Sequence, residues 1–202
     1  PPIPVLHWIV ALLAAAFAGA VFGALVGWLK AKFEVSEVVA TIMLNYIAFF
    51  ISRWACMQIP GSNTYRTPSF PPSAMLTSPF LQSLTNDSRL NRGLWITILC
   101  CILYWFVIEK TKLGFELRAT GYNREAAQCS GIKTSSRITI SMVFAGVFAG
   151  LAGAIVALGS FSYGRVLSGL DNYGFNGIAA ALVGNNTGLG TFLAGLLFGM
   201  LA

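Results

Sequence analysis

Four neutral polar side chains interrupt apolar stretches of this sequence, and they are its candidates for contact with a polar solute. They are Thr41, Asn45, Asn176 and Asn185. Thr41 and Asn45 lie one turn apart on a helix predicted over residues 37–54. Polar groups inside a membrane span face protein or a water-filled cavity rather than lipid. Two interpretations stay open: hydrogen bonds between packed helices, or a pathway whose amides and hydroxyls suit a sugar or nucleoside better than an ion.

The remaining reactive residues form no arrangement that supports catalysis or metal binding. His7, the single histidine, sits in an apolar stretch. The sequence has no Ser/His/Asp or Cys/His set, no carboxylate pair and no GxxxxGK[ST] phosphate loop. We therefore expect no catalytic residue, no metal and no cofactor in this chain, so that any energy must come from another chain. The cysteines also lack metal or redox spacing; they are Cys56, Cys100, Cys101 and Cys129.

The composition indicates an integral membrane protein. Of the 202 residues, 56% are hydrophobic and 10% are charged, whereas soluble domains carry about 25% charged residues. The mean hydropathy is +0.72. The net charge of +6 is interpreted as loop charge that sets membrane topology, because no run of Lys and Arg suggests a nucleic-acid surface.

Long uncharged runs predict the helices that position the polar residues. Spans are expected over residues 5–29, 37–54, 94–108 and 138–164, and the first, as a helix, is about 37 Å long, which is enough to cross a bilayer with tilt. Ser36 is a candidate cap for the second. The fold class is therefore all-α, a polytopic transmembrane helical bundle, with 1–202 as a single transmembrane domain. The missing initial Met and the apolar run up to the last residue predict a piece of a longer protein.

Small residues recur at every fourth position in two of these spans. Such stripes let a second helix approach closely. The span over residues 138–164 carries two overlapping stripes, which predicts packing on more than one side. The stripes are Gly19, Gly23 and Gly27 in the first span, and Gly146 with Gly150 and Ala149 with Gly153 in the last.

The loops predict the topology. The basic turn 30–32 and the basic loop 110–137 contain eight of the thirteen Lys and Arg residues and are expected inside, since positively charged loops stay in the cytoplasm. The loop 55–92 contains five of the eight prolines together with apolar side chains, so it is expected to be a structured external loop. A sequon at residues 86–88 is attributed to chance.

The final third of the chain contains a helical run that is too short to span. Residues 177–183 lie between Asn176 on one side and Gly184 and Asn185 on the other. A half-helix at membrane depth is tolerated only where protein or a cavity satisfies its backbone, and broken helices of this kind often line transport sites. The alternative is a helix-loop-helix outside the bilayer.

Residues 113–133 form the most highly charged polar interval between spans. Asn123 is a candidate N-cap, residues 124–130 suit one or two helical turns, and Gly131 suits the left-handed position past the helix end. So short a helix is not stable alone in water. It must rest on its own membrane domain, for which Phe115 and Leu117 are the candidate anchors, or on a partner protein.

This interval resembles the cytoplasmic coupling segment of a family. GYNREAA at residues 121–127, followed by SGI at 130–132, is similar to ABC importer permeases of the simple-sugar, nucleoside and branched-chain amino-acid group. Three blocks agree in order: residues 30–48, 146–159 and 174–184. The first block looks most like the nucleoside branch. The sequence departs from the family pattern at Arg124, where proline is common, and at Asn176, where aspartate is common.

The resemblance implies a mechanism and partners. Two permease subunits in a bacterial inner membrane would form the path for a nucleoside or simple sugar, and an external binding protein would deliver the substrate. Separate ATPase subunits, carrying ATP and magnesium, would grip the coupling segment. Alternatives left open are a pentose or other sugar as substrate, a self-powered secondary transporter or channel, and a scaffold subunit. The residues implied in coupling are Gly121, Asn123, Arg124, Glu125, Ala126, Ala127 and Gly131.

Overall fold

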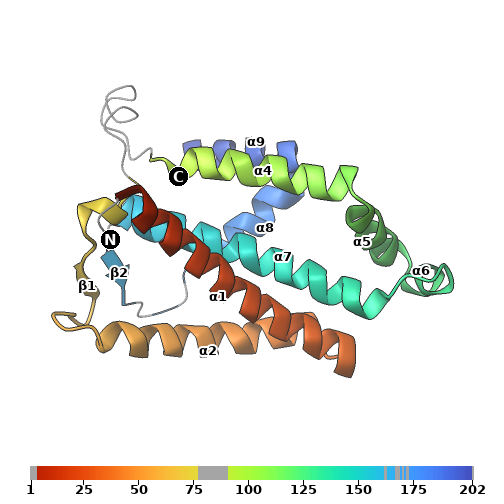
Figure 1. Cartoon of the computed structure of the whole chain (residues 1–202), viewed down its shortest axis with the longest axis horizontal. Coiled ribbons are helices and arrows are strands. Elements are labelled where there is room, and N and C mark those ends of the chain that lie inside the picture. Colours follow the sequence, from red (N-terminus) through yellow and green to blue (C-terminus); the bar gives the residue numbers. More distant parts are fainter. Residues whose placement is uncertain are drawn as a thin grey trace.

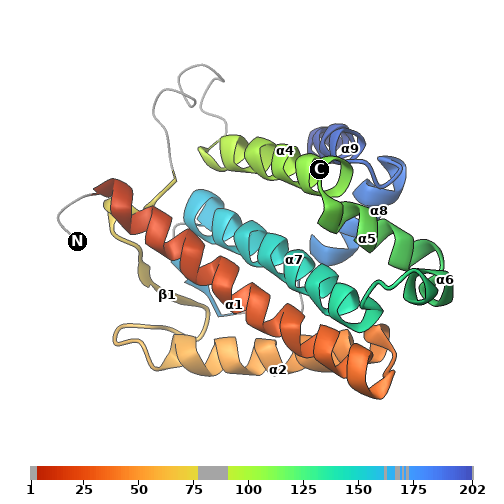
Figure 2. The same ribbon diagram turned by 45° about the vertical axis from the view of Figure 1, so that its right-hand side comes forward.

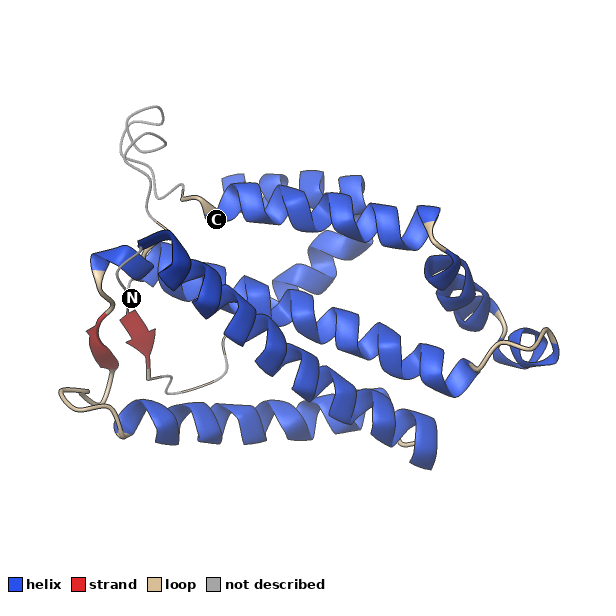
Figure 3. Ribbon diagram, viewed as in Figure 1, coloured by secondary structure: helices blue, strands red, loops and turns tan. Residues whose placement is uncertain are grey.

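The computed structural model describes residues 4–76, 91–161, 163–166, 169, 171 and 173–201. Helices dominate this part of the chain (Figure 3), which confirms the all-α fold class. The α-helices are α1 (Pro4–Phe33), α2 (Glu37–Met57), α4 (Gly93–Lys110), α5 (Lys112–Tyr122), α6 (Arg124–Cys129), α7 (Thr134–Ile155), α8 (Tyr173–Val183) and α9 (Gly188–Leu201). The other elements are the 3-10 helix η1 (Pro72–Ala74), the π-helix η2 (Val156–Phe161) and the strands β1 (Arg66–Ser69) and β2 (Tyr163–Arg165).

Four of the described helices are long and apolar enough to cross a membrane. They cover His7–Phe33, Glu37–Met57, Gly93–Lys110 and Thr134–Phe161. These are the four predicted spans with shifted ends. Ser36 precedes α2 but makes no capping hydrogen bond with its side chain. Instead, Glu37 pairs with Lys30 at 2.6 Å across the turn between α1 and α2.

The prediction that the last span continues to residue 164 was wrong. The helix ends at Phe161, and Tyr163–Arg165 forms β2, which pairs antiparallel with β1 in the proline-rich interval. The Gly164 N–H donates to the Thr67 hydroxyl at 2.9 Å, and Arg66 lies over the Tyr163 ring. The strand therefore forms because a distant segment supplies its partner. Residues 77–90, including the sequon, lie outside the described residues.

The core of the bundle is the crossing of α1 and α7. A Cβ atom built on Gly19 would overlap the carbonyl oxygen of Gly146, and one on Gly23 would overlap that of Met142. The two backbones are therefore in direct contact, which confirms the close approach predicted from the glycine stripe. By contrast, the space around Gly153 is open among the described residues. Of the two predicted stripes on α7, the one formed by Gly146 and Gly150 therefore packs against α1, and the one that contains Gly153 packs against no described helix.

The spans share one axis and sort the loops to opposite ends (Figure 1). Helix α2 lies on one side of the α1–α7 pair, and α4 and α9 lie on the other side in both Figure 1 and Figure 2. Helices α5 and α6 lie at the end where α1 finishes, whereas β1 and β2 lie at the opposite end. The two basic loops thus share one end, as the topology prediction requires.

Candidate functional site

The tip of the molecule is the short helix α6, and local chemistry fixes both of its ends. The Asn123 side-chain oxygen accepts a hydrogen bond from the Ala126 N–H at 3.0 Å, which caps the start of the helix. Past the end, Gly131 has φ +81°, and the Ile132 N–H reaches the Ala127 carbonyl at 3.1 Å, as in a Schellman motif. The predicted N-cap and the predicted left-handed glycine are both confirmed.

Helix α5, which precedes α6, is a feature that the sequence reasoning missed. The Thr111 hydroxyl donates to the Val107 carbonyl at 2.6 Å and accepts from the Gly114 N–H at 3.1 Å. A Cβ atom on Gly114 would overlap the carbonyl oxygens of Val107 and Ile108. The chain therefore folds back on the end of α4 at once, and this holds α5 against the span.

Three ion pairs connect α5 and α6 to three different spans. Arg118 contacts both carboxylate oxygens of Glu109 on α4 at 3.2 Å, and Arg124 contacts Glu34, next to α1, at 3.1 Å. Both of these pairs are exposed, and such pairs contribute about 0–1 kcal/mol each. The third pair joins Glu116 on α5 to Arg137 on α7 at 2.5 Å, and the Glu116 side chain is only 12% exposed.

The outer surface of this segment is free among the described residues. Tyr122 is 90% exposed, and Asn123, Glu125 and Ala126 are also exposed. Ala127 is buried within the chain, so it holds α6 in place and does not contribute to this surface. Of the two candidate anchors, Phe115 is 62% exposed, which is contrary to the anchoring role predicted for it, and Leu117 is partly covered.

Helices α8 and α9, which include the short helical run predicted over residues 177–183, form a helical hairpin beside the middle of α4. A Cβ atom on Gly188, the first residue of α9, would lie 3.3 Å from both the Cys101 carbonyl oxygen and the Tyr104 ring. Cys101 is the ninth residue of the 18-residue helix α4, counted from Gly93. The turn between α8 and α9 therefore lies beside the middle of the candidate span α4, as expected for a half-helix at membrane depth.

The hairpin turn satisfies its own backbone. The Thr187 hydroxyl donates to the Gly184 carbonyl at 2.9 Å and accepts from the Gly190 N–H at 3.1 Å. A Cβ atom on Gly184 would overlap the backbone of Thr191, so α8 and α9 are in backbone contact. Internal hydrogen bonds of this kind are what non-helical backbone requires at membrane depth.

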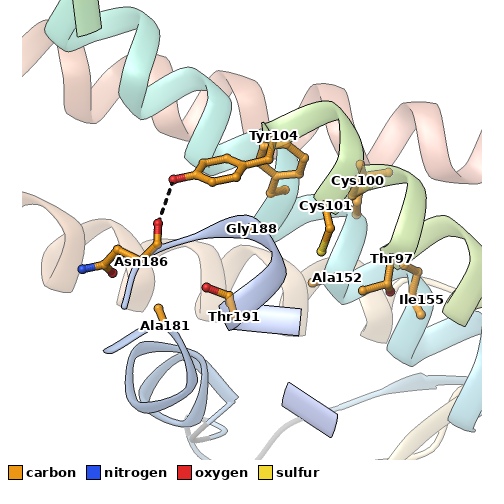
Figure 4. A pocket seen from close by; sticks show the side chains of 12 residues that line it. Thr97, Cys100, Cys101, Tyr104, Ala152, Ile155, Ala181, Asn186, Gly188 and Thr191 are labelled. Carbon is orange, nitrogen blue, oxygen red and sulfur yellow. Dashed lines mark hydrogen bonds between the residues drawn. The ribbon is translucent and has the colours of Figure 1, made fainter. Parts of the chain in front are cut away.

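A cavity of about 410 Å³ lies between this hairpin, α4 and α7 (Figure 4). Its walls are mainly apolar, with a few hydroxyl, thiol and amide groups at the edges. Its residues are Thr97, Cys100, Cys101 and Tyr104 on α4; Phe148, Leu151, Ala152 and Ile155 at the end of α7; and Ala181, Asn186, Gly188 and Thr191 on the hairpin.

Comparison with known proteins identifies the architecture. Residues 4–202 match the family described as the permease component of a branched-chain amino acid transport system. The chain belongs to this permease family. It is therefore a multi-pass protein of the cytoplasmic membrane, and the resemblance predicted from the basic interval is confirmed.

Three relatives place the permease within its family. It is 43% identical to the guanosine ABC transporter permease protein NupP of Bacillus subtilis over 96% of this chain and 56% of that protein. It is 37% identical to the nucleoside ABC transporter permease protein NupB of Lactococcus lactis over 91% of this chain and 53% of that protein. The glucose ABC transporter permease protein TsgB13 of Haloferax volcanii is 30% identical over 94% of this chain and 52% of that protein. The chain thus spans about half the length of these relatives, and no solved structure matches it.

The structure does not bring the four predicted pathway residues of the permease together. Thr41 and Asn45 are exposed on α2, where the Thr41 hydroxyl donates to the Glu37 carbonyl at 2.8 Å. Asn176 and Asn185 are exposed on the hairpin, on the other side of the α1–α7 pair (Figure 1). The asparagine that lines the cavity is instead Asn186, whose backbone carbonyl accepts a hydrogen bond from the Tyr104 hydroxyl at 3.5 Å (Figure 4).

The cavity residues that the sequence reasoning missed carried a detectable signal. Thr97, Cys101 and Tyr104 recur at helical spacing on one face of the third predicted span, now α4. Asn185 and Asn186 both have positive φ, 53° and 54°, a conformation that asparagine tolerates better than most side chains. Asn185 and Asn186 are therefore explained first of all by the left-handed backbone conformation of the turn.

Proposed function

We propose that this chain is the membrane-spanning part of an ATP-driven importer for nucleosides. The observation that carries the proposal is the identity of 43% and 37% to permeases whose names specify guanosine and nucleoside. The anchored, exposed coupling segment supports the ATP-driven part of the proposal. The cavity at mid-depth supports passage of a solute of moderate size.

In this account a separate ATPase chain grips the surface formed by Tyr122, Asn123, Glu125 and Ala126. ATP and magnesium belong to that chain, and no catalytic step is assigned to the permease. A six-residue helix would not keep its shape alone, but α5 and the two caps hold it for the partner. Movement of the ATPase then reaches the spans through the contacts of α5 and α6 with α1, α4 and α7.

Two further partners complete the proposal. A second permease subunit forms the path together with this one, and unused small-residue surface such as that around Gly153 suits close helix packing. An external binding protein delivers the substrate at the end that carries β1 and β2. There Arg66 and Tyr65 are exposed.

The coupling role is tested by changing the exposed face of α6. Glu125→Arg or Ala126→Trp in the full-length permease should leave its amount in the membrane unchanged. Guanosine uptake should fall at least tenfold while the ATPase remains active, because the grip on the segment is lost. Lys133→Ala is the matched control, since Lys133 is exposed, is not part of this surface, and belongs to none of the ion pairs described above. Normal uptake by both α6 variants would contradict the proposal.

A sugar is the second candidate substrate, favoured by the 30% identity to a glucose permease. Uptake of a radiolabelled panel of nucleosides, pentoses and glucose, in cells lacking the chromosomal copy, separates the two. The proposal predicts that nucleosides are taken up and compete with one another, and that free sugars do not compete. Uptake of glucose or ribose alone would favour the second candidate.

A further inference from the structure

The cavity beside the hairpin is lined by none of the four residues predicted for the pathway. Its lining side chains favour one class of solute over another. It is formed by four elements of one chain, and its 410 Å³ lies in the range of about 300–1,000 Å³ that is usual for small-molecule sites. It lies at mid-depth, beside the broken helix pair. Such half-helices mark solute sites in other transport folds.

We propose that this cavity holds the base of a nucleoside during transport, an inference that rests on the proposed function. Tyr104 on α4 and Phe148 on α7 both line the cavity and contact each other edge to face, with ring centroids 6.4 Å apart and planes at 74°. Aromatic rings of this kind contact a flat heterocycle favourably by stacking or edge-to-face packing. The remaining walls, from Leu151 to Ile155, are aliphatic.

A few polar groups are placed to orient the base. The Thr97 hydroxyl donates to the Gly93 carbonyl at 2.9 Å, so its oxygen keeps a lone pair for an N–H of the base. Within the described part of the chain, the Thr191 hydroxyl, which also lines the cavity, makes no hydrogen bond. The Tyr104 hydroxyl reaches the Asn186 carbonyl at 3.5 Å, a distance at which the bond is weak and readily exchanged for a ligand.

The same walls disfavour a free sugar. Nearly every carbon of a pentose or hexose carries a hydroxyl, and burying these against aliphatic side chains without hydrogen-bond partners is costly. A nucleoside can place its base in the cavity and leave its ribose outside. The cavity therefore selects the base and explains how one fold can serve nucleosides where related permeases are named for sugars.

Thiol protection tests the site directly. In the full-length permease, Cys56, Cys100 and Cys129 are replaced by Ala, which leaves Cys101 as the reporter among these four residues. N-ethylmaleimide labelling is then timed with guanosine, with ribose and without ligand, and a version that keeps Cys129 instead is the control. Guanosine should slow the labelling of Cys101 at least fivefold, while ribose should not, and Cys129 on α6 should label equally in all cases. Equal labelling of Cys101 with and without guanosine, in a preparation that still takes up guanosine, would overturn the site but not the proposed function.

Filling the cavity gives a second test that does not depend on thiol reactivity. Ala152→Phe places a ring in the cavity, whereas Ala145→Phe places the same ring on the same face of α7, seven residues away and not among the lining residues. Ala152→Phe should raise the KM for guanosine at least tenfold at an unchanged amount of protein, and Ala145→Phe should not. Unchanged guanosine uptake by Ala152→Phe would overturn the proposal. If the unmodified permease also failed to take up guanosine, that result would contradict the proposed function rather than the site.

Discussion

At the residue scale, single atoms decide whether the two central helices can meet. Gly19 and Gly23 on α1 contact the carbonyls of Gly146 and Met142 on α7. A methyl group at either position would have to push two backbones apart. Overpacking of this kind costs about 1–3 kcal/mol, and here the obstacle is backbone, which cannot rotate away.

Gly23→Ala should therefore lower the stability of the permease by about 2 kcal/mol. Gly177→Ala on α8 is the matched control, since the space around Gly177 is open among the described residues and alanine favours a helix over glycine. Thermal unfolding of the full-length protein in detergent measures both. An equal unfolding temperature for Gly23→Ala and the unmodified protein would show that the backbones are not in contact.

Single residues also show what the sequence can predict. Asn123 and Gly131 were found because a helix cap is a local device, in which a side chain or a glycine serves its own neighbours. Asn186 and Thr191 were missed because their role depends on which helix lies opposite. Nothing in the local sequence specifies that α4 faces them.

At the element scale, helix α5 connects the exposed tip to the core, and in the proposed mechanism it would transmit the movement of the ATPase. Its half-buried pair, Glu116 with Arg137, is the least exposed of the three described ion pairs that join this segment to the rest of the chain. Because α7 and α1 are in backbone contact, the proposed mechanism predicts that a displacement of Arg137 moves both spans together. The exposed pair of Arg124 with Glu34 is expected to contribute less.

Glu116→Arg should uncouple ATP hydrolysis from guanosine uptake, because two cations then face each other at the joint between α5 and α7. Uptake should fall several-fold while hydrolysis by the assembled complex continues. The exchange Glu116→Arg with Arg137→Glu should restore uptake, since it restores the pair. Failure of the exchange to restore any uptake, at a normal amount of assembled complex, would show that the pair does not carry the coupling.

The hairpin of α8 and α9 depends on two glycines in backbone contact. A Cβ atom on Gly184 would overlap the backbone of Gly190 and Thr191, whereas the space around Gly177 on α8 is open. Gly184→Ala should therefore open the hairpin, lower stability by about 1–3 kcal/mol and reduce uptake, and Gly177→Ala should do neither. Unfolding temperature and uptake are measured on the same preparations. Equal behaviour of the two variants would contradict the backbone contact.

The helices and strands that were predicted correctly are those whose formation depends on nearby residues in the sequence. The four spans follow from long apolar runs, so only their ends were uncertain. The strand pair of β1 and β2 joins segments about a hundred residues apart, and no alternation over four residues specifies such a pairing. Helix α5 has a local N-cap in Thr111, but the sequence does not indicate that Arg137 on α7 pairs with Glu116 of this helix.

At the scale of the whole molecule, one end of the bundle carries most of the Lys and Arg residues. The basic turn and the basic loop meet where Arg124 pairs with Glu34, and this end carries the exposed tip. The cavity lies halfway along the spans, between the tip and the strand pair. In the proposed function, the ATPase would bind at one end, the solute would pass through the middle, and the external binding protein would dock at the other end.

The central claim is that a nucleotide-driven partner, acting on α6, moves nucleosides across the membrane. The most direct measurement is guanosine uptake into proteoliposomes that contain the full-length permease, with and without its ATPase chain and ATP. The account predicts uptake only when both the ATPase and ATP are present, with loss of that uptake in Ala126→Trp. Equal uptake by the permease alone, or ATP-driven uptake that Ala126→Trp leaves unchanged, would contradict it.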